Sequence, residues 1–255
     1  MNILVIGDVV SDKGCEFLRA KLPGLKKLKS IDYCIANGEN SAVGNGVTPH
    51  SAEYLFDSGV DFITLGNHAF RRHEVYEYLD SCGRIIRPAN FHSSCPGKGY
   101  AKVDLGYAEM LIINLMGRVY MDDCGNPFDC VDEILSKEKC RITLVDFHGE
   151  ATAEKKAMGY YLDGRVSAVF GTHTHVMTAD AEILPKGTGY ITDLGMTGPV
   201  NSVLGVKPEI SIGKIKTGMP ARFDTADGEC MINGCIFEID KNTGLCTGTE
   251  PLNIR

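Results

Sequence analysis

The chain has 255 residues, which is enough for one large α/β domain or two small ones without support from disulfides. Its 26 Lys and Arg and 33 Asp and Glu residues give a net charge of −7, so the overall field does not favour broad binding to nucleic acid or to membrane surfaces. No apolar stretch approaches the ~20 residues of a membrane-spanning helix, and the N-terminal residues do not resemble a signal peptide. We therefore expect a cytoplasmic protein with one domain over residues 1–255 and its ten cysteines reduced.

Three strand–turn–helix units open the chain. Apolar runs predict strands at residues 2–7, 31–36 and 60–65. The first helix begins at Ser11 and is interrupted at Pro23-Gly24, and the second begins at Thr48-Pro49, with Thr48 as the N-cap. Repeated units of this kind predict right-handed crossovers and a largely parallel central sheet, whose carboxyl ends share one edge.

The rest of the chain mixes short strands with helices. We predict helices at residues 73–82, from Asn126-Pro127 onward, and at 151–162. Residues 84–115 contain short β runs that suggest an antiparallel or mixed portion, and later strands are expected at 84–87, 100–105, 110–115, 141–147, 166–170, 181–184, 189–192 and 229–239. A Gly-rich loop at 193–205 borders a pocket, and a turn at 242–244 signals a hairpin.

Polar side chains follow several of these strands at the point where each strand ends. In a largely parallel sheet such ends meet at one edge, where ligand chemistry is usually found. Carboxylate, amide and imidazole donors without thiolate suit Mn²⁺, Fe or Zn²⁺. The sequence therefore predicts a metal site from the following residues: Asp8, Glu39, Asn40, Asn67, His68, His148, His173 and His175.

The pair His173-x-His175 has several interpretations when taken alone. In an extended chain the two imidazoles point to one side with Cα atoms about 6–7 Å apart, so they suit one ion or two adjacent ions. They could equally be hydrogen-bonded without metal. Similarly, Asp8 could cap the helix that follows it rather than bind an ion.

Four other classes of site fit the sequence less well. An amidohydrolase also uses His-x-His, but there the pair follows the first strand of a barrel. Here the pair comes late in the chain, at residue 173. Covalent phosphatase chemistry needs a pattern such as Cys-x5-Arg, which is absent, as is the Walker pattern. Gly44-x-Gly46 resembles a phosphate-binding loop but lacks its third glycine, so we interpret both glycines as turn residues.

Five short motifs together resemble those of the calcineurin-like metallophosphoesterases, in the same order: Gly7-Asp8, Asn37-Gly38-Glu39-Asn40, Gly66-Asn67-His68, Phe147-His148 and Gly171-Thr172-His173-Thr174-His175. Within that superfamily the chain resembles the YmdB-type branch, and the likeness runs over nearly its whole length, including residues 114–120, 126–128 and 192–199. The resemblance implies a four-layer α/β/β/α sandwich with a two-metal centre at the carboxyl ends of the strands.

The resemblance also implies a role for each residue. Asp8, Glu39, Asn40 and His175 would hold one ion, and Glu39, Asn67, His148 and His173 the other, so that Glu39 bridges the two. His68 would be the proton donor. Iron is the metal that the family suggests, with manganese and zinc as alternatives. Val10 stands where many members of the broader superfamily have a histidine, and Asn40 would substitute for it.

The implied activity is metal-dependent phosphodiester hydrolysis by a metal-bridging hydroxide, on cyclic nucleotides such as 2′,3′-cyclic nucleotides, with RNA or simple phosphoesters as further candidates. Two divalent ions, two carboxylates and one hydroxide leave a charge of about +1, which suits an anionic phosphoryl group. The alternative is a weakly catalytic or non-catalytic regulator that binds nucleotide or RNA on this fold. We also expect a homo-oligomer.

Two departures from the branch bear on substrate preference. Ala69-Phe70-Arg71-Arg72 replaces the Thr-Trp-Asp expected after Asn-His, and Met177 stands where a proline is usual. Arg71 or Arg72 could bind phosphate, or both could simply be solvated.

Overall fold

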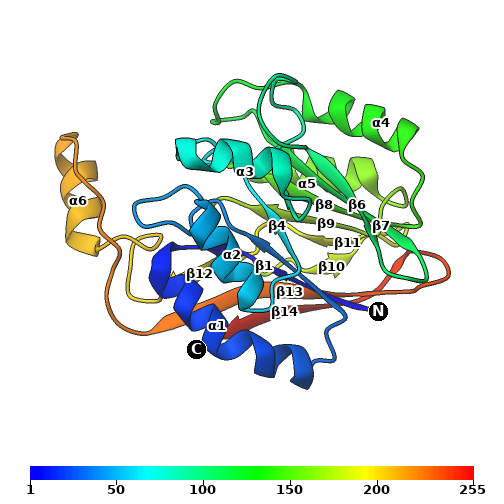
Figure 1. Ribbon diagram of the computed structural model, residues 1–255, viewed down its shortest axis with the longest axis horizontal. Coiled ribbons are helices and arrows are strands. Elements are labelled where there is room, and N and C mark those ends of the chain that lie inside the picture. Colours follow the sequence, from blue (N-terminus) through cyan, green and yellow to red (C-terminus); the bar gives the residue numbers. More distant parts are fainter.

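Two β-sheets face each other in the computed structural model, which describes residues 1–255 (Figure 1). The first sheet has the order β2 (Asp8–Val9), β12 (Met196–Pro199), β13 (Cys230–Ile239), β1 (Asn2–Ile6), β3 (Tyr33–Asn37), β4 (Phe62–Thr64) and β5 (Ile85–Ile86), with β14 (Cys246–Ile254) also paired to β13. The second has the order β10 (Glu182–Ile183), β11 (Gly189–Ile191), β9 (Ala168–Thr172), β8 (Ile142–His148), β7 (Glu109–Met116) and β6 (Tyr100–Asp104).

Alternation along the strands divides the interior into three hydrophobic layers. On β1, Ile3 and Val5 point toward the second sheet, whereas Leu4 and Ile6 point toward helices on the outer face. The outer face of the first sheet is covered by α1 (Ser11–Leu28), α2 (Pro49–Asp57), the short 3₁₀ turn η1 (His73–Val75) and α3 (Tyr76–Ser81). The second sheet is covered by α4 (Pro127–Lys137) and α5 (Thr152–Leu162). This confirms the α/β/β/α sandwich that the calcineurin-like resemblance implied.

One helix stands apart from these layers. The helix α6 (Pro208–Thr217) lies at one end of the molecule and finishes at Gly218, whose φ of 71° closes the helix in the left-handed region (Figure 1). Its only buried residue is Ser211. Sequence reasoning did not find α6, because the helix buries no apolar stripe that would give a helical period.

The structure corrects three details of the predicted elements. The strand ends that carry the candidate site come from two sheets and not from one. The helix α1 runs through Pro23-Gly24, because both residues face solvent while Leu22 and Leu25 keep its buried stripe intact. Residues 196–199 of the predicted loop form β12, which pairs with β2 and β13.

Other expectations are confirmed. Thr48 caps α2 by accepting a hydrogen bond from the Ser51 backbone amide at 3.0 Å. Asn126 caps α4 in the same way, because its side-chain oxygen accepts from the Phe128 backbone amide at 3.0 Å. The second sheet is mixed, and β13 and β14 form an antiparallel hairpin. None of the helices combines the length and apolar character that a membrane-spanning segment requires.

A buried ion pair connects α5 to the carboxyl end of β9. The Lys155 ammonium donates to the Asp193 carboxylate at 2.6 Å and to the Thr172 carbonyl at 2.8 Å, and both charged side chains are only 1 % exposed. The same carboxylate accepts from the backbone amides of Thr174 at 3.0 Å and Gly195 at 2.8 Å. Lys155 and Asp193 therefore hold the backbone on both sides of His173.

We predict that Lys155→Met destabilises the metal-free protein by about 3–5 kcal/mol, because it leaves the Asp193 carboxylate buried without its cation. Urea unfolding measures the effect. The matched control is Glu133→Gln, which breaks the exposed pair between Lys137 and Glu133 and should leave the midpoint unchanged. Midpoints that fall equally in the two variants would contradict a structural role for the buried pair.

Candidate metal centre

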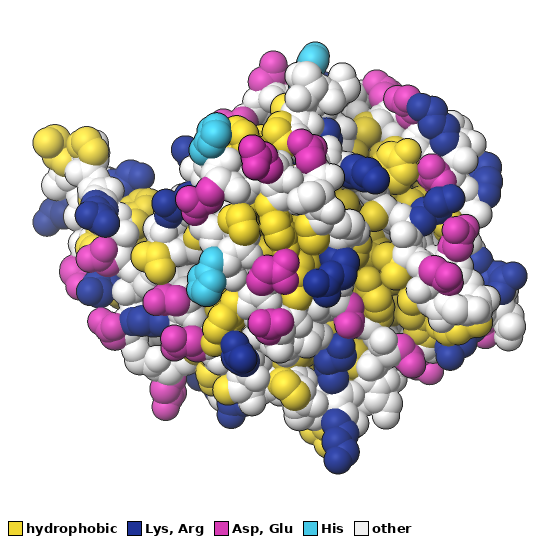
Figure 2. Space-filling model, viewed as in Figure 1, with side chains coloured by type: hydrophobic (Ala, Val, Ile, Leu, Met, Phe, Trp, Pro, Cys, Tyr) yellow, Lys and Arg dark blue, Asp and Glu magenta, His cyan; other side chains and the backbone are white.

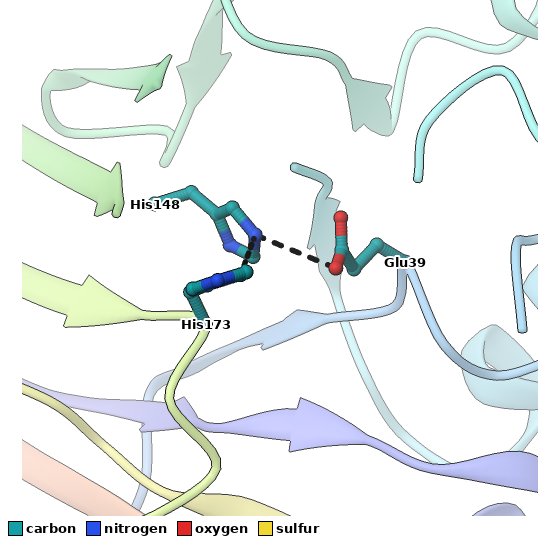
Figure 3. Close-up of side chains that lie close together, drawn as sticks. All are labelled: Glu39, His148 and His173. Carbon is teal, nitrogen blue, oxygen red and sulfur yellow. Dashed lines mark hydrogen bonds and ion pairs between the residues drawn. The ribbon is translucent and has the colours of Figure 1, made fainter. Parts of the chain in front are cut away.

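Three candidate ligands meet where β3, β8 and β9 end. Glu39 follows β3, His148 is the last residue of β8, and His173 follows β9. His148 Nε2 lies 3.4 Å from Glu39 Oε1 and 3.1 Å from His173 Nδ1, and one ligand atom from each residue lies within 4.8 Å of the others (Figure 3). Glu39 and His148 are almost completely buried. This group is suited to holding a metal ion.

Asn67 adds a fourth donor to this group, because its Oδ1 lies 2.9 Å from His148 Nε2. The residue before it has to be glycine. A Cβ at Gly66 would lie 2.3 Å from the His148 ring and 2.5 Å from Glu39 Oε2. The turn after β4 can therefore approach the centre closely only without a side chain at position 66.

A second group of donors lies beside the first. His175 Nε2 is 3.7 Å from Asp8 Oδ1 and 3.3 Å from Asn40 Nδ2. Asn40 Nδ2 also donates to Glu39 Oε1 at 3.2 Å, which joins the two groups through Glu39. Asp8 Oδ1 is buried and has no hydrogen-bond partner, as expected of an oxygen whose partner is a cation. The donor set and this orphaned oxygen fit a metal ion.

Each of the three histidines has one ring nitrogen held from behind and the other aimed at the centre. His148 Nδ1 contacts Thr172 Oγ1 at 2.8 Å, His173 Nε2 lies 3.2 Å from Glu150 Oε2, and His175 Nδ1 contacts the Leu204 carbonyl at 3.1 Å. Partners of this kind fix the tautomer and orientation of histidines that bind metals. The lone pairs of all three imidazoles are thereby directed into the same space.

A buried network supports His148 from below and crosses between the sheets. The Thr172 hydroxyl donates to Asp146 at 2.7 Å, so its oxygen is free to accept from His148 Nδ1. Asp146 also accepts from the Thr64 hydroxyl and, at 3.4 Å, from Asn37 Nδ2, both on the first sheet. Burial raises the pKa of Asp146 to about 6. The network thus fixes the two sheets relative to one another directly beneath the candidate ligands.

Buried carboxylates dominate the electrostatics of the centre. Burial raises the pKa of Asp8, whereas for Glu39 the effect of burial is outweighed by His148 and His68, which hold its pKa well below the usual range. For His148, burial alone would lower the pKa, but Glu39, Asp8 and Asp146 raise it to about 9. Burial, aided by His148, lowers the pKa of His173 to about 3. The centre therefore attracts a cation to His148, either a proton or a metal ion that competes with it.

His68 lies beside the ligands and has a free ring nitrogen. Its backbone amide donates to Glu39 Oε2 at 2.9 Å, and its Nδ1 lies 2.8 Å from Asn40 Oδ1 and 3.2 Å from Glu39 Oε1. No protein atom accepts from or donates to Nε2, and the side chain is 21 % exposed on the wall of a cavity. His68 can therefore present this nitrogen to a bound molecule.

The backbone that carries two of the histidines is strained. His173 and His175 have φ angles of 105° and 61°, in a region that residues with a Cβ seldom adopt. Hydrogen bonds from the amides of His173 to Asp8 and of Thr174 to Asp193 hold this conformation. The segment after β9 is therefore bent and not extended as the sequence suggested, yet both imidazoles still face the centre.

A cavity of about 630 Å³ opens in front of the centre. Its lining includes Glu39, His68, His173 and His175 together with residues of α6 and of the segment 203–206. Arg71 also lines the cavity, whereas Arg72 does not. The predicted loop that would border a pocket is therefore confirmed in its last part.

The eight predicted site residues are thus brought to one place, but sequence reasoning missed the residues that support them. These are Glu150, Thr172, Asp146, Lys155 and Asp193, together with the carbonyl of Leu204. Asp146 did carry a signal, since it is a charged residue inside the apolar strand before His148. The carbonyl of Leu204 gave none, because any residue supplies a carbonyl.

Comparison with known proteins gives a consistent assignment. A family model described as "YmdB-like protein" matches residues 4–252. The Bacillus subtilis (strain 168) protein named 2′,3′-cyclic-nucleotide 2′-phosphodiesterase is 44% identical over 256 residues, which span 100% of this chain and 97% of that protein. Among solved structures, a hypothetical protein from Thermus thermophilus superposes with a TM-score of 0.94 at 40% identity, over 99% of this chain and 98% of that one. A structure described as a novel phosphatase from Mycoplasma pneumoniae has a TM-score of 0.95 at 35% identity, over 100% of this chain and 93% of that one. The chain belongs to the YmdB-like family.

Proposed function

We propose that this chain is a metal-dependent phosphodiesterase whose substrates are cyclic nucleotides, with 2′,3′-cyclic nucleotides as the first candidates. The observation that carries the proposal is the common orientation of His148, His173 and His175 toward buried carboxylates. The names of the Bacillus and Mycoplasma relatives support the reaction class. Two divalent ions supply, when bound, an activated water and the charge neutralisation that phosphoryl transfer needs.

The proposed ligands follow from the two groups of donors. Glu39, Asn67, His148 and His173 would hold one ion, and Asp8, Glu39, Asn40 and His175 the other. Asn40 would coordinate only after its amide turns over, because its oxygen now faces His68 and its nitrogen faces His175. Iron, manganese and zinc all suit imidazole and carboxylate donors.

His68 is the proposed proton donor. A protonated His68 would donate through Nδ1 to the Glu39 carboxylate, whose Oε1 lies 3.2 Å away and stabilises the positive charge. Its Nε2 would then carry the proton toward the leaving oxygen in the cavity.

The proposal has four further parts: a single domain over residues 1–255, a cytoplasmic location, a homo-oligomer and action on RNA.

A substrate screen tests the proposed reaction. The protein loaded with Mn²⁺ or Fe²⁺ is incubated with 2′,3′- and 3′,5′-cyclic nucleotides, phosphomonoesters and short RNA, and we expect turnover of at least one cyclic nucleotide. Metal content is measured on the same samples. Two bound ions with no turnover of any substrate would contradict the proposed phosphodiesterase activity and favour a regulator that binds nucleotide or RNA.

Glu39→Gln tests the bridging role. The substitution removes a charge that both proposed sites share, so we expect the occupancy of both ions to fall, whereas Asp8→Asn should reduce mainly one. Elemental analysis after dialysis gives the number of ions per chain. Finding two tightly held ions in Glu39→Gln would show that Glu39 does not bridge.

His68→Asn tests the proton donor. A ribose oxygen needs a proton in order to leave, and such help is worth about 10²–10⁴ in rate, whereas a nitrophenolate leaves without it. We expect the variant to keep its fold and both ions, to lose much of its activity on a ribose-leaving diester, and to lose far less on a nitrophenyl phosphodiester. If both activities fall by the same factor, His68 has another role.

A further inference from the structure

Arg71 and Arg72 are adjacent but have different environments. The Arg72 guanidinium donates to the carbonyls of Asn45, at 3.0 Å, and Val43, so it fastens the loop after β3. The Arg71 guanidinium forms no hydrogen bond and no ion pair with the protein, and it lines the cavity in front of the metal centre. The donors of Arg72 are used within the fold, whereas those of Arg71 are free for a bound molecule.

The backbone of Arg71 is held in place although its side chain is exposed. Its amide donates to the His68 carbonyl at 3.0 Å, so Arg71 belongs to the same turn as the proposed proton donor. Ala69 is buried, and the Phe70 ring packs against Tyr76 and Phe91 with centroid distances of 5.6 and 5.8 Å. The turn therefore fixes the base of Arg71 relative to His68, on the side of the cavity where the leaving group would lie.

Only one other Lys or Arg side chain lines this cavity. It is Lys214 of α6, whose ammonium lies over the Phe223 ring at 4.5 Å from the centroid. Exposed hydrophobic side chains of α6 extend from there toward its outer end (Figure 2). The Lys214 ammonium is therefore engaged with an aromatic ring, and Arg71 is the free cation in the turn that follows His68.

We propose that Arg71 binds a second phosphate group of the substrate, which makes nucleotides with a phosphate on the leaving-group side the preferred substrates. A planar guanidinium with free donors pairs well with phosphate, and it would be held here by a fixed turn. For a 2′,3′-cyclic nucleotide, the sugar is the leaving group and its 5′ position carries the second phosphate. This inference rests on the proposed function, because the proposed role of His68 determines on which side of the cavity the leaving group lies.

Equilibrium binding tests the subsite without requiring turnover. Dissociation constants of the Mn²⁺-loaded full chain for adenosine 3′-monophosphate and adenosine 3′,5′-bisphosphate are measured by calorimetry, and their ratio is the readout. We expect the bisphosphate to bind about tenfold more tightly to the natural protein, and Arg71→Gln to bring the ratio close to one. Lys214→Gln, which removes the other cation of the cavity, is the matched control and should keep the ratio.

The proposal is overturned if the natural protein binds both nucleotides equally, if Arg71→Gln keeps the ratio, or if the ratio is lost in Lys214→Gln instead. Circular dichroism of each variant verifies that the fold is intact, as expected for an exposed side chain. The outcome is distinct from the substrate screen, because a ratio that depends on Arg71 in a protein without turnover would contradict the phosphodiesterase and retain the phosphate subsite.

Discussion

Buried negative charge at the junction of the two sheets is the constraint on which the rest of the structure depends. Asp8, Glu39, Asp146 and Asp193 are each no more than 1 % exposed, and isolated carboxylates in such positions are costly. Lys155 pairs with Asp193, and hydroxyl and amide donors satisfy Asp146. Asp8 and Glu39 have only histidines as cationic partners, and one oxygen of Asp8 has no hydrogen-bond partner. The fold thus creates a demand for cations at the place where the histidines point.

The architecture explains how this charge is brought together. Each sheet delivers part of the centre, since Asp8, Glu39 and Asn67 follow strands of the first sheet, whereas His148 ends a strand of the second and His173 and His175 follow another. The hydrophobic layer between the sheets sets their separation, and the Asp146 network fixes their relative position below the ligands. A substitution in that layer would therefore alter distances across the centre as well as stability.

Much of the fold and site could be predicted because it depends on local patterns. Apolar runs located the strands, Thr48 and Asn126 located helix starts, and polar residues directly after strands located the candidate ligands. The pairing of the strands into two sheets depends on contacts between distant segments, so alternation and propensity placed all the ligands on one sheet. The course of α1 through Pro23 and the position of α6 depend on which side of each helix faces solvent. The supports of the histidines, such as Glu150 and the Leu204 carbonyl, appear only once the loops are folded together.

The position of bound ions is the most direct test of a metal centre at this junction. Crystals of the Mn²⁺-loaded protein, measured at a wavelength where manganese scatters anomalously, would locate each ion independently of the protein atoms. We predict one peak among Glu39, Asn67, His148 and His173, a second between Asp8 and His175, and the Glu39 carboxylate in contact with both. Peaks elsewhere, or full Mn²⁺ loading with no peak at these residues, would contradict the claim that the buried carboxylates and oriented histidines form a metal centre.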